Sequence, residues 1–163
     1  MALTPYTAIT KPTVGNGVSK ADEGDPMVDN FTRLHTLEDQ AIWIPLNGAT
    51  ALVAGDKAYW RVPTKFNGGT LVGVAAACKV ASTSGAIVLT VKNGATAMLS
   101  TDLTIDETET DTNTSSAPAV IDTAHDDLTN DGAAAADLLE FSVVSPGASV
   151  TYCGIEITVR PAA

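Results

Sequence analysis

The chain has 163 residues, of which 45% are hydrophobic and 17% charged, and its 9 Lys and Arg against 19 Asp and Glu give a formal net charge of -10. This length fits one ordinary domain with its own core, and the acidic balance argues against nucleic acid or an anionic membrane as a partner. The sequence has no apolar run of transmembrane length and no signal-peptide pattern at its start, so we expect a soluble protein made in the cytoplasm.

The first 24 residues are rich in Pro and Gly and show neither helical nor strand periodicity, so we expect an extended arm. A helix is predicted to start at Asp25, because an Asp followed by Pro26 suits an N-cap with proline at the first helical position. Met27, Phe31 and Leu34 then form one apolar stripe of about two turns. A helix this short must dock, either on its own domain or on a neighbouring subunit.

From Ala41 onward the apolar residues recur with a period of two, which predicts β-strands. Between residues 70 and 80 the alternation puts Val72 and Val74 on the richer face and Leu71 on the opposite one. The other clear strands each have an inward row of apolar side chains. These rows are Ile87, Leu89 and Val91, then Leu139, Phe141 and Val143, and finally Cys153, Ile155, Ile157 and Val159.

Two turn signals predict hairpins between these strands. Asn93-Gly94 is the strongest short signal for a two-residue hairpin turn, and Pro146-Gly147 reverses the chain before the last strand. Weaker strands are expected at residues 41–46, 58–62, 103–107 and 119–122. About eight short strands in this length predict two packed antiparallel sheets, so we expect an all-β sandwich over residues 41–163 after an arm and helix over residues 1–40.

The charges are distributed unevenly along the chain. Twelve of the acids lie between Lys92 and Arg160, a stretch without Lys or Arg, whereas the first 65 residues contain six of the nine cations. We therefore expect one end of the molecule to be more negative than the other. If the protein docks, it is expected to dock with its N-terminal half.

Two acidic segments contain residue types that occur in metal or catalytic sites. The run Asp106–Asp111, with the sequence DETETD, offers carboxylates at alternate positions for calcium, but it lacks the glycine and the ligand spacing of a calcium loop. His125 lies beside Asp126 and Asp127, but no second histidine or cysteine stands nearby at ligand spacing. A solvated loop and an exposed histidine are the favoured interpretations, and the sequence predicts no catalytic residue, no metal and no cofactor.

Two further pairs of residues attract notice. Cys78 and Cys153 both fall on predicted inward faces, so a disulfide is conceivable, but two buried thiols are favoured in a protein made in the cytoplasm. Tyr59 and Trp60 belong to the densest aromatic and basic cluster. Alternation places their rings on opposite faces, so we expect one ring in the core and the other exposed as a single possible platform for a sugar.

Several segments of the strand region carry a family resemblance. They are Trp60–Pro63, Gly69–Val74, the Val91–Thr96 hairpin, Leu138–Val144 and Ile155–Val159. On these segments, the chain from Tyr59 to Val159 resembles a β-sandwich domain that recurs in virion proteins of tailed bacteriophages. The resemblance implies a jelly-roll-like arrangement of the sheets, and the arm around Lys11 looks similar to the attachment segments of such proteins.

The resemblance implies a virion structural protein and no enzyme, and we expect a capsid decoration (cement) protein more than a tail fibre. Jelly-roll decoration proteins commonly assemble as trimers, so the implied partners are further copies of this chain and the major capsid protein, on the outside of the capsid. The residues expected to make trimer and capsid contacts are Tyr6, Ile9, Lys11, Met27, Phe31 and Leu34. The alternative is a tail-fibre or host-recognition module that binds carbohydrate through Tyr59 or Trp60.

Overall fold

The computed structural model describes residues 38–130, 132 and 137–162. These residues form antiparallel β-strands and one short 3-10 helix, which confirms the predicted all-β, sandwich-like fold class. Within this part of the chain, no helix has the length and apolar character needed to cross a membrane.

The strands form two main sheets. The first sheet has the order β1-β10-β3, and the second has the order β2-β9-β4-β5, with β7 also paired to β4. The members of the first are β1 (Gln40–Pro45), β10 (Gly154–Arg160) and β3 (Thr70–Ala77). The members of the second are β2 (Lys57–Arg61), β9 (Leu138–Pro146), β4 (Ile87–Asn93), β5 (Thr96–Ala97) and β7 (Leu103–Ile105). A small third sheet pairs β6 (Leu99–Thr101) with β8 (Val120–Ile121), and η1 (Thr64–Phe66) follows β2.

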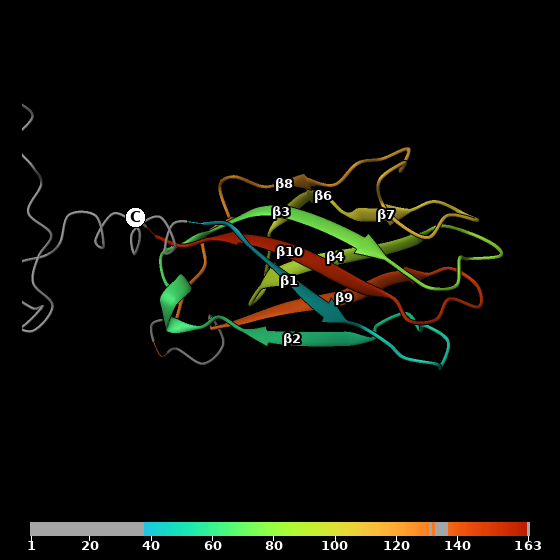
Figure 1. Ribbon diagram of the computed structural model, residues 1–163, viewed down its shortest axis with the longest axis horizontal. Coiled ribbons are helices and arrows are strands. Elements are labelled where there is room, and N and C mark those ends of the chain that lie inside the picture. Colours follow the sequence, from blue (N-terminus) through green and yellow to red (C-terminus); the bar gives the residue numbers. More distant parts are fainter. Residues whose placement is uncertain (1–37, 131, 133–136, 163) are drawn as a thin grey trace, which may run out of the picture. The chain divides into compact units, whose positions relative to one another are not determined.

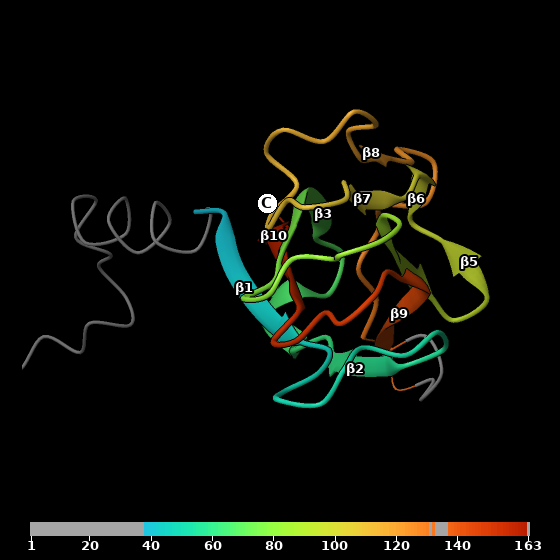
Figure 2. The same cartoon turned by 90° about the vertical axis from the view of Figure 1, so that its right-hand side faces the viewer.

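The main strands run along the long direction in Figure 1, and the turned view of Figure 2 separates the β1-β10 side from the β9-β2 side. The apolar rows predicted for the β4, β9 and β10 segments are all buried between the sheets. Burial of one such side chain contributes about 1.5–3 kcal/mol to folding, so these rows form the stabilising core. The four weaker strand predictions are confirmed as β1, β2, β7 and β8.

A β-bulge in β3 changes which of its residues face the core. Gly73 pairs with Thr158, but the next pair joins Leu71 to Val159, so Val72 is an extra residue in the strand. The extra residue reverses the alternation, and Leu71 is buried while Val72 is only partly buried. The prediction that Leu71 faces away from the core is therefore wrong.

The hairpin at Asn93-Gly94 is confirmed, with a shift of one residue. Asn93 pairs with Thr96, so the two turn residues are Gly94 and Ala95. Gly94 has a φ of 59° and Ala95 has no positive φ, which is the φ pattern of a type II′ turn. The turn therefore needs glycine at its first position, and Asn93 ends the strand.

The second predicted hairpin is wrong. Strands β9 and β10 follow each other in the chain, but β9 pairs with β2 and β4, whereas β10 pairs with β1 and β3. Gly147 has a φ of 61°, so the chain turns where Pro146-Gly147 predicts. The segment of residues 147–153 then crosses from one sheet to the other.

The predicted arm and almost all of the predicted helix lie outside the described residues. The same holds for all six residues expected to make trimer and capsid contacts, which are Tyr6, Ile9, Lys11, Met27, Phe31 and Leu34. The expected trimer and capsid contacts of these residues therefore stay predictions.

Candidate functional site

The outer face of the first sheet carries an exposed tryptophan. In β1, Ile42 and Ile44 point toward the core, so the residue between them, Trp43, points outward and keeps 48% of its surface exposed. Strand β1 is an edge strand, because within the described residues it pairs with β10 alone. Trp43 therefore stands on the rim of the sheet.

Gly154 determines where the Trp43 ring lies. Trp43 pairs with Glu156 across the ladder, but its ring packs over Gly154, the next outward residue of β10. A Cβ atom on Gly154 would come within 2.4 Å of a ring carbon of Trp43 and 2.7 Å of the main-chain oxygen of Ile44. Only glycine leaves room for the ring at this place, so the ring rests against the sheet.

The adjoining strand β3 presents small residues on the same face. Gly73, Ala75 and Ala77 pair with Thr158, Glu156 and Gly154 of β10. Their short side chains keep the sheet surface low beside the tryptophan ring. We call the outward surface formed by Trp43, Ala75, Ala77, Gly154 and Glu156 the Trp43 face.

A shallow groove of about 210 Å³ lies on the Trp43 face, at the edge of β3. Its far wall is the segment of residues 111–113, and main-chain hydrogen bonds of Thr110 and Thr112 fix this segment to β3. The N–H of Cys78 donates to the Thr110 oxygen at 2.7 Å, and the N–H of Thr112 donates to the Ala76 oxygen at 3.1 Å. These two bonds attach the wall of the groove to the edge of β3.

The groove carries two carboxylates, from Asp111 and Glu156. Asp111 accepts a hydrogen bond from the N–H of Asn113 at 2.8 Å, which leaves its second oxygen for another donor. Lys79, two residues beyond the end of β3, lies over the ring of Tyr152 at 5.2 Å. An aromatic ring, small apolar residues and two carboxylates suit an extended chain that brings a basic side chain, because ring and carboxylates both attract a cation.

The predicted sugar platform lies on the other sheet. The rings of Tyr59 and Trp60 point to opposite sides of β2, as alternation predicts: Tyr59 is 58% exposed and Trp60 packs against Phe66 at 6.0 Å between ring centroids. Trp60 is thus partly in the core, and Tyr59 is the ring that remains accessible. Its hydroxyl donates to Glu140 at 3.2 Å, and Glu140 also forms an ion pair with Lys57 at 2.9 Å.

These contacts shift two titrations on the outer face of the second sheet. The hydrogen bond and the charge of Lys57 hold the pKa of Glu140 below its usual value, and Glu140 raises the pKa of Lys57. Lys92 stands opposite Glu140 in the ladder and favours the carboxylate further. Tyr59 therefore lies beside a cluster of charged side chains.

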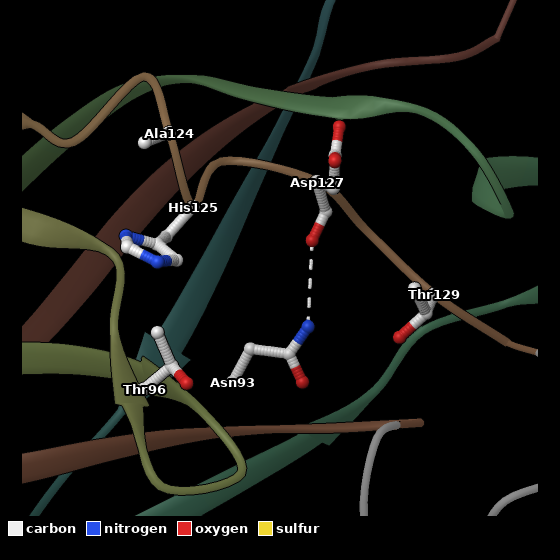
Figure 3. A pocket seen from close by; sticks show the side chains of 6 residues that line it. All are labelled: Asn93, Thr96, Ala124, His125, Asp127 and Thr129. Atoms are coloured by element: carbon white, nitrogen blue, oxygen red, sulfur yellow. Dashed lines mark hydrogen bonds between the residues drawn. The ribbon is translucent and has the colours of Figure 1, made fainter.

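His125 lines a polar pocket of about 320 Å³ at the end of the sandwich where β4 turns into β5 (Figure 3). Its Nδ1 lies 2.7 Å from a carboxylate oxygen of Asp122, and this contact lowers the pKa of Asp122. Across the pocket, the amide of Asn93 donates to the main-chain oxygen of Asp127 at 3.4 Å. The prediction of an exposed loop histidine is confirmed, and its carboxylate partner is Asp122, not the adjacent Asp126 or Asp127.

In the acidic run Asp106–Asp111, the carboxylates of Asp106 and Glu107 accept hydrogen bonds from other segments. Asp106 accepts from the N–H of Ser116 at 2.7 Å and from its hydroxyl at 3.1 Å, and Glu107 accepts from the N–H of Gly85 at 3.3 Å. Among residues 38–130, 132 and 137–162, no three His, Cys, Asp or Glu side chains come together as a possible metal site.

The acidic residues are divided between both ends of the sandwich. Asp111 pairs with Ala77 at one end of β3, and Asp127 pairs with Thr70 at the other end. Two loops that are close in sequence are therefore far apart in the fold. Acidic residues therefore stand at both ends of β3, and the expectation that one end of the molecule is more negative than the other stays a prediction.

Sequence reasoning missed Trp43, although a signal was available. The alternation of Ile42 and Ile44 already implies that Trp43 points outward. What the sequence hides is its neighbour Gly154, which is brought to Trp43 only by the pairing of the first sheet.

Comparison of the chain with protein-family models, with curated proteins and with solved structures finds no match.

Proposed function

We propose that this chain is a capsid decoration protein of a tailed bacteriophage, a non-enzymatic structural protein that binds the outside of the head shell as a homotrimer. The resemblance of its strand motifs supports the kind of virion protein. The observation that carries the proposal is the Trp43 face, a built surface where a large exposed ring stands beside small residues. Covering such a surface with a partner removes apolar area from water and so favours binding.

The occupant that fits the Trp43 face is an extended segment of the major capsid protein that carries a Lys or Arg side chain. Small residues at positions 73, 75 and 77 allow another backbone to approach closely. Asp111 and Glu156 provide the negative charge that a basic side chain needs, and the Trp43 ring adds a cation–π contact. The face combines β1, from the N-terminal half of the chain, with the C-terminal strand β10 and the acidic residue Asp111.

The test is binding of the purified protein to capsids that lack it. Trp43→Ala is expected to weaken binding by about 30-fold, which corresponds to the loss of one central aromatic contact. Tyr59→Ala is the matched control, because it removes a similarly exposed ring from the other sheet, and its affinity is expected to equal that of the unmodified protein. Equal binding of the Trp43→Ala variant would overturn the role of this face.

Residues 1–24 and the trimer are tested separately. Removal of residues 1–24 is expected to weaken capsid binding, because extended arms gain their contacts when they order on a partner. Undiminished binding would exclude the arm from the interface. Light scattering of the purified chain is expected to give the mass of three copies, and a monomer at all concentrations would contradict the trimer.

A second candidate function is host recognition by carbohydrate binding, and the exposed Tyr59 ring beside Lys57 and Glu140 is the observation that favours it. Under this hypothesis Tyr59→Ala abolishes binding to cells or glycans, whereas Trp43→Ala leaves it unchanged. Loss of binding in Trp43→Ala therefore supports the first candidate function, and loss of binding in Tyr59→Ala supports the second. A glycan array without signal would remove the second candidate.

A further inference from the structure

Cys78 and Cys153 are both buried, with 8% and 1% of their surfaces exposed, and both are free thiols. This agrees with the prediction of two buried thiols. Cys78 follows β3 and Cys153 precedes β10, so each lies one residue beyond the paired ends of neighbouring strands. Their mutual position follows from the register of that pair.

The register places the two cysteines directly opposite each other. Gly154 pairs with Ala77, and on the far side Val80 pairs with Thr151. Both pairs belong to the same antiparallel register. In that register, the residue opposite Cys78 is Cys153. Charge on Cys78 raises the pKa of Cys153, as expected for neighbouring side chains.

The hydrogen bonds show which kind of cross-strand pair this is. The N–H of Cys78 donates away from β10, to the Thr110 oxygen at 2.7 Å. The N–H of Cys153 donates to the side chain of Asn47 at 2.6 Å, and its oxygen accepts from Leu46 at 2.9 Å, both on the β1 side. The two cysteines therefore form a non-hydrogen-bonded pair, in which Cα atoms are about 4.5 Å apart and side chains are closest.

We infer that Cys78 and Cys153 are a latent cross-strand disulfide, closed by a low-molecular-weight disulfide such as oxidised glutathione. A Cα separation of about 4.5 Å lies within the range of natural disulfides, about 4.4–6.8 Å. The bond would link the end of β3 to the start of β10 and close a loop that contains most of the sandwich. Such a link stabilises the fold chiefly by restricting the unfolded chain.

The reaction is two successive thiol–disulfide exchanges. The thiolate of Cys78 attacks one sulfur of oxidised glutathione, forming a mixed disulfide and releasing one glutathione thiolate. The thiolate of Cys153 then attacks the Cys78 sulfur and releases the second glutathione. One molecule of oxidised glutathione is thereby reduced to two glutathione thiols, which take up the two protons lost by the protein thiols. Burial raises the pKa of both thiols, that of Cys153 to about 12, so oxidation is slow at neutral pH and accelerates in alkaline solution.

The biological setting rests on the proposed function, whereas the chemistry does not. A reducing host cytoplasm keeps the thiols free during assembly, and the released particle meets oxidising surroundings. The bond would then form after assembly and strengthen the subunit in the mature virion.

The experiment uses the purified full chain in a series of reduced and oxidised glutathione mixtures at several pH values. Remaining thiols are alkylated, and intact mass and non-reducing peptide maps are recorded. We expect both thiols to disappear together, the mass to fall by two hydrogens, and one linked peptide pair to contain Cys78 and Cys153. The melting temperature is expected to rise by about 10 °C.

Three results would overturn the inference: retention of both thiols at the most oxidising and alkaline condition, a lasting glutathione adduct on one cysteine, or disulfide-linked dimers. The control is Cys153→Ala, which is expected to give only a glutathione adduct on Cys78 and no increase in melting temperature. If that variant does not fold, the peptide map of the unmodified chain still decides. Failure of capsid binding leaves this result untouched, so the two proposals fail independently.

Discussion

The two outer faces of the sandwich each expose one large aromatic ring on an edge strand, Trp43 on β1 and Tyr59 on β2. Their surroundings differ. Gly154 and two alanines of β3 lie near Trp43, whereas Tyr59 stands among Lys57, Glu140 and Lys92. The two rings are thus exposed to a similar extent, and the two faces differ in the residues that surround the ring.

The neighbours decide what it costs to cover each ring. A partner on the Trp43 face removes the ring and the alanines from water, which is favourable at about 25 cal/mol per Å². A basic side chain of the partner would compensate the carboxylates of Asp111 and Glu156 that are covered with them. A partner on Tyr59 would also have to strip water from the ion pair of Lys57 and Glu140, and that desolvation opposes binding. The residues around an exposed ring therefore decide whether its surface suits docking.

The largest effect on stability is expected from Gly154→Ala, which fills the space in which the Trp43 ring packs. The added Cβ would meet both the ring and the main-chain oxygen of Ile44, and the latter cannot move without disturbing β1. We expect a loss of about 1–3 kcal/mol in the free energy of unfolding. Denaturant melts measure this loss, and a red shift of tryptophan emission reports that Trp43 has left the sheet.

Gly48→Ala is the matched control for this substitution. Gly48 is exposed, and a Cβ there would have no neighbouring heavy atom within 4 Å. We expect its free energy of unfolding to change by less than about 0.5 kcal/mol. Equal stability of the two variants would show that the ring does not depend on Gly154.

A smaller effect is expected on the Tyr59 side from Glu140→Gln, which removes the carboxylate that Lys57 and Tyr59 share. The folded-state pKa of Glu140 is below its ordinary value, so the carboxylate stabilises the fold above pH 4.5 and loses this contribution as the pH falls through the folded-state pKa. At neutral pH we expect a melting temperature lower by about 1–3 °C. The difference from the unmodified chain should vanish in acid, and a constant difference at every pH would contradict the assigned ion pair.

Local patterns predicted the fold where neighbours in sequence decide the structure. The alternation of Leu139, Phe141 and Val143 correctly identified a strand with one buried face, because burial of one face requires a period of two. Pro146-Gly147 correctly marked a turn, but it could not tell whether the flanking strands pair. Partner choice depends on contacts between distant segments, and here each strand joins a different sheet.

The candidate site was less accessible to sequence reasoning for the same physical cause. Trp43 and Gly154 are joined only by the pairing of β1 with β10, and Asp111 reaches the groove only through its bridge to Ala77. The bulge at Val72 likewise depends on the partner strand, so the inward turn of Leu71 could not be read from its own segment. Aromatic density in the sequence instead drew attention to Tyr59 and Trp60.

The smallest effect is expected from Tyr59→Phe, because this change keeps the exposed ring and removes only the hydroxyl that donates to Glu140. Lys57 is the main cause of the lowered pKa of Glu140, with the hydroxyl a minor one, so a carboxyl titration by NMR should show that pKa rising only slightly. We expect a change in melting temperature of less than about 2 °C. A large rise in stability would mean that the hydroxyl is held there at a cost, as in a site kept for a polar ligand, and the hydrated Tyr59 side would then become the better candidate for binding.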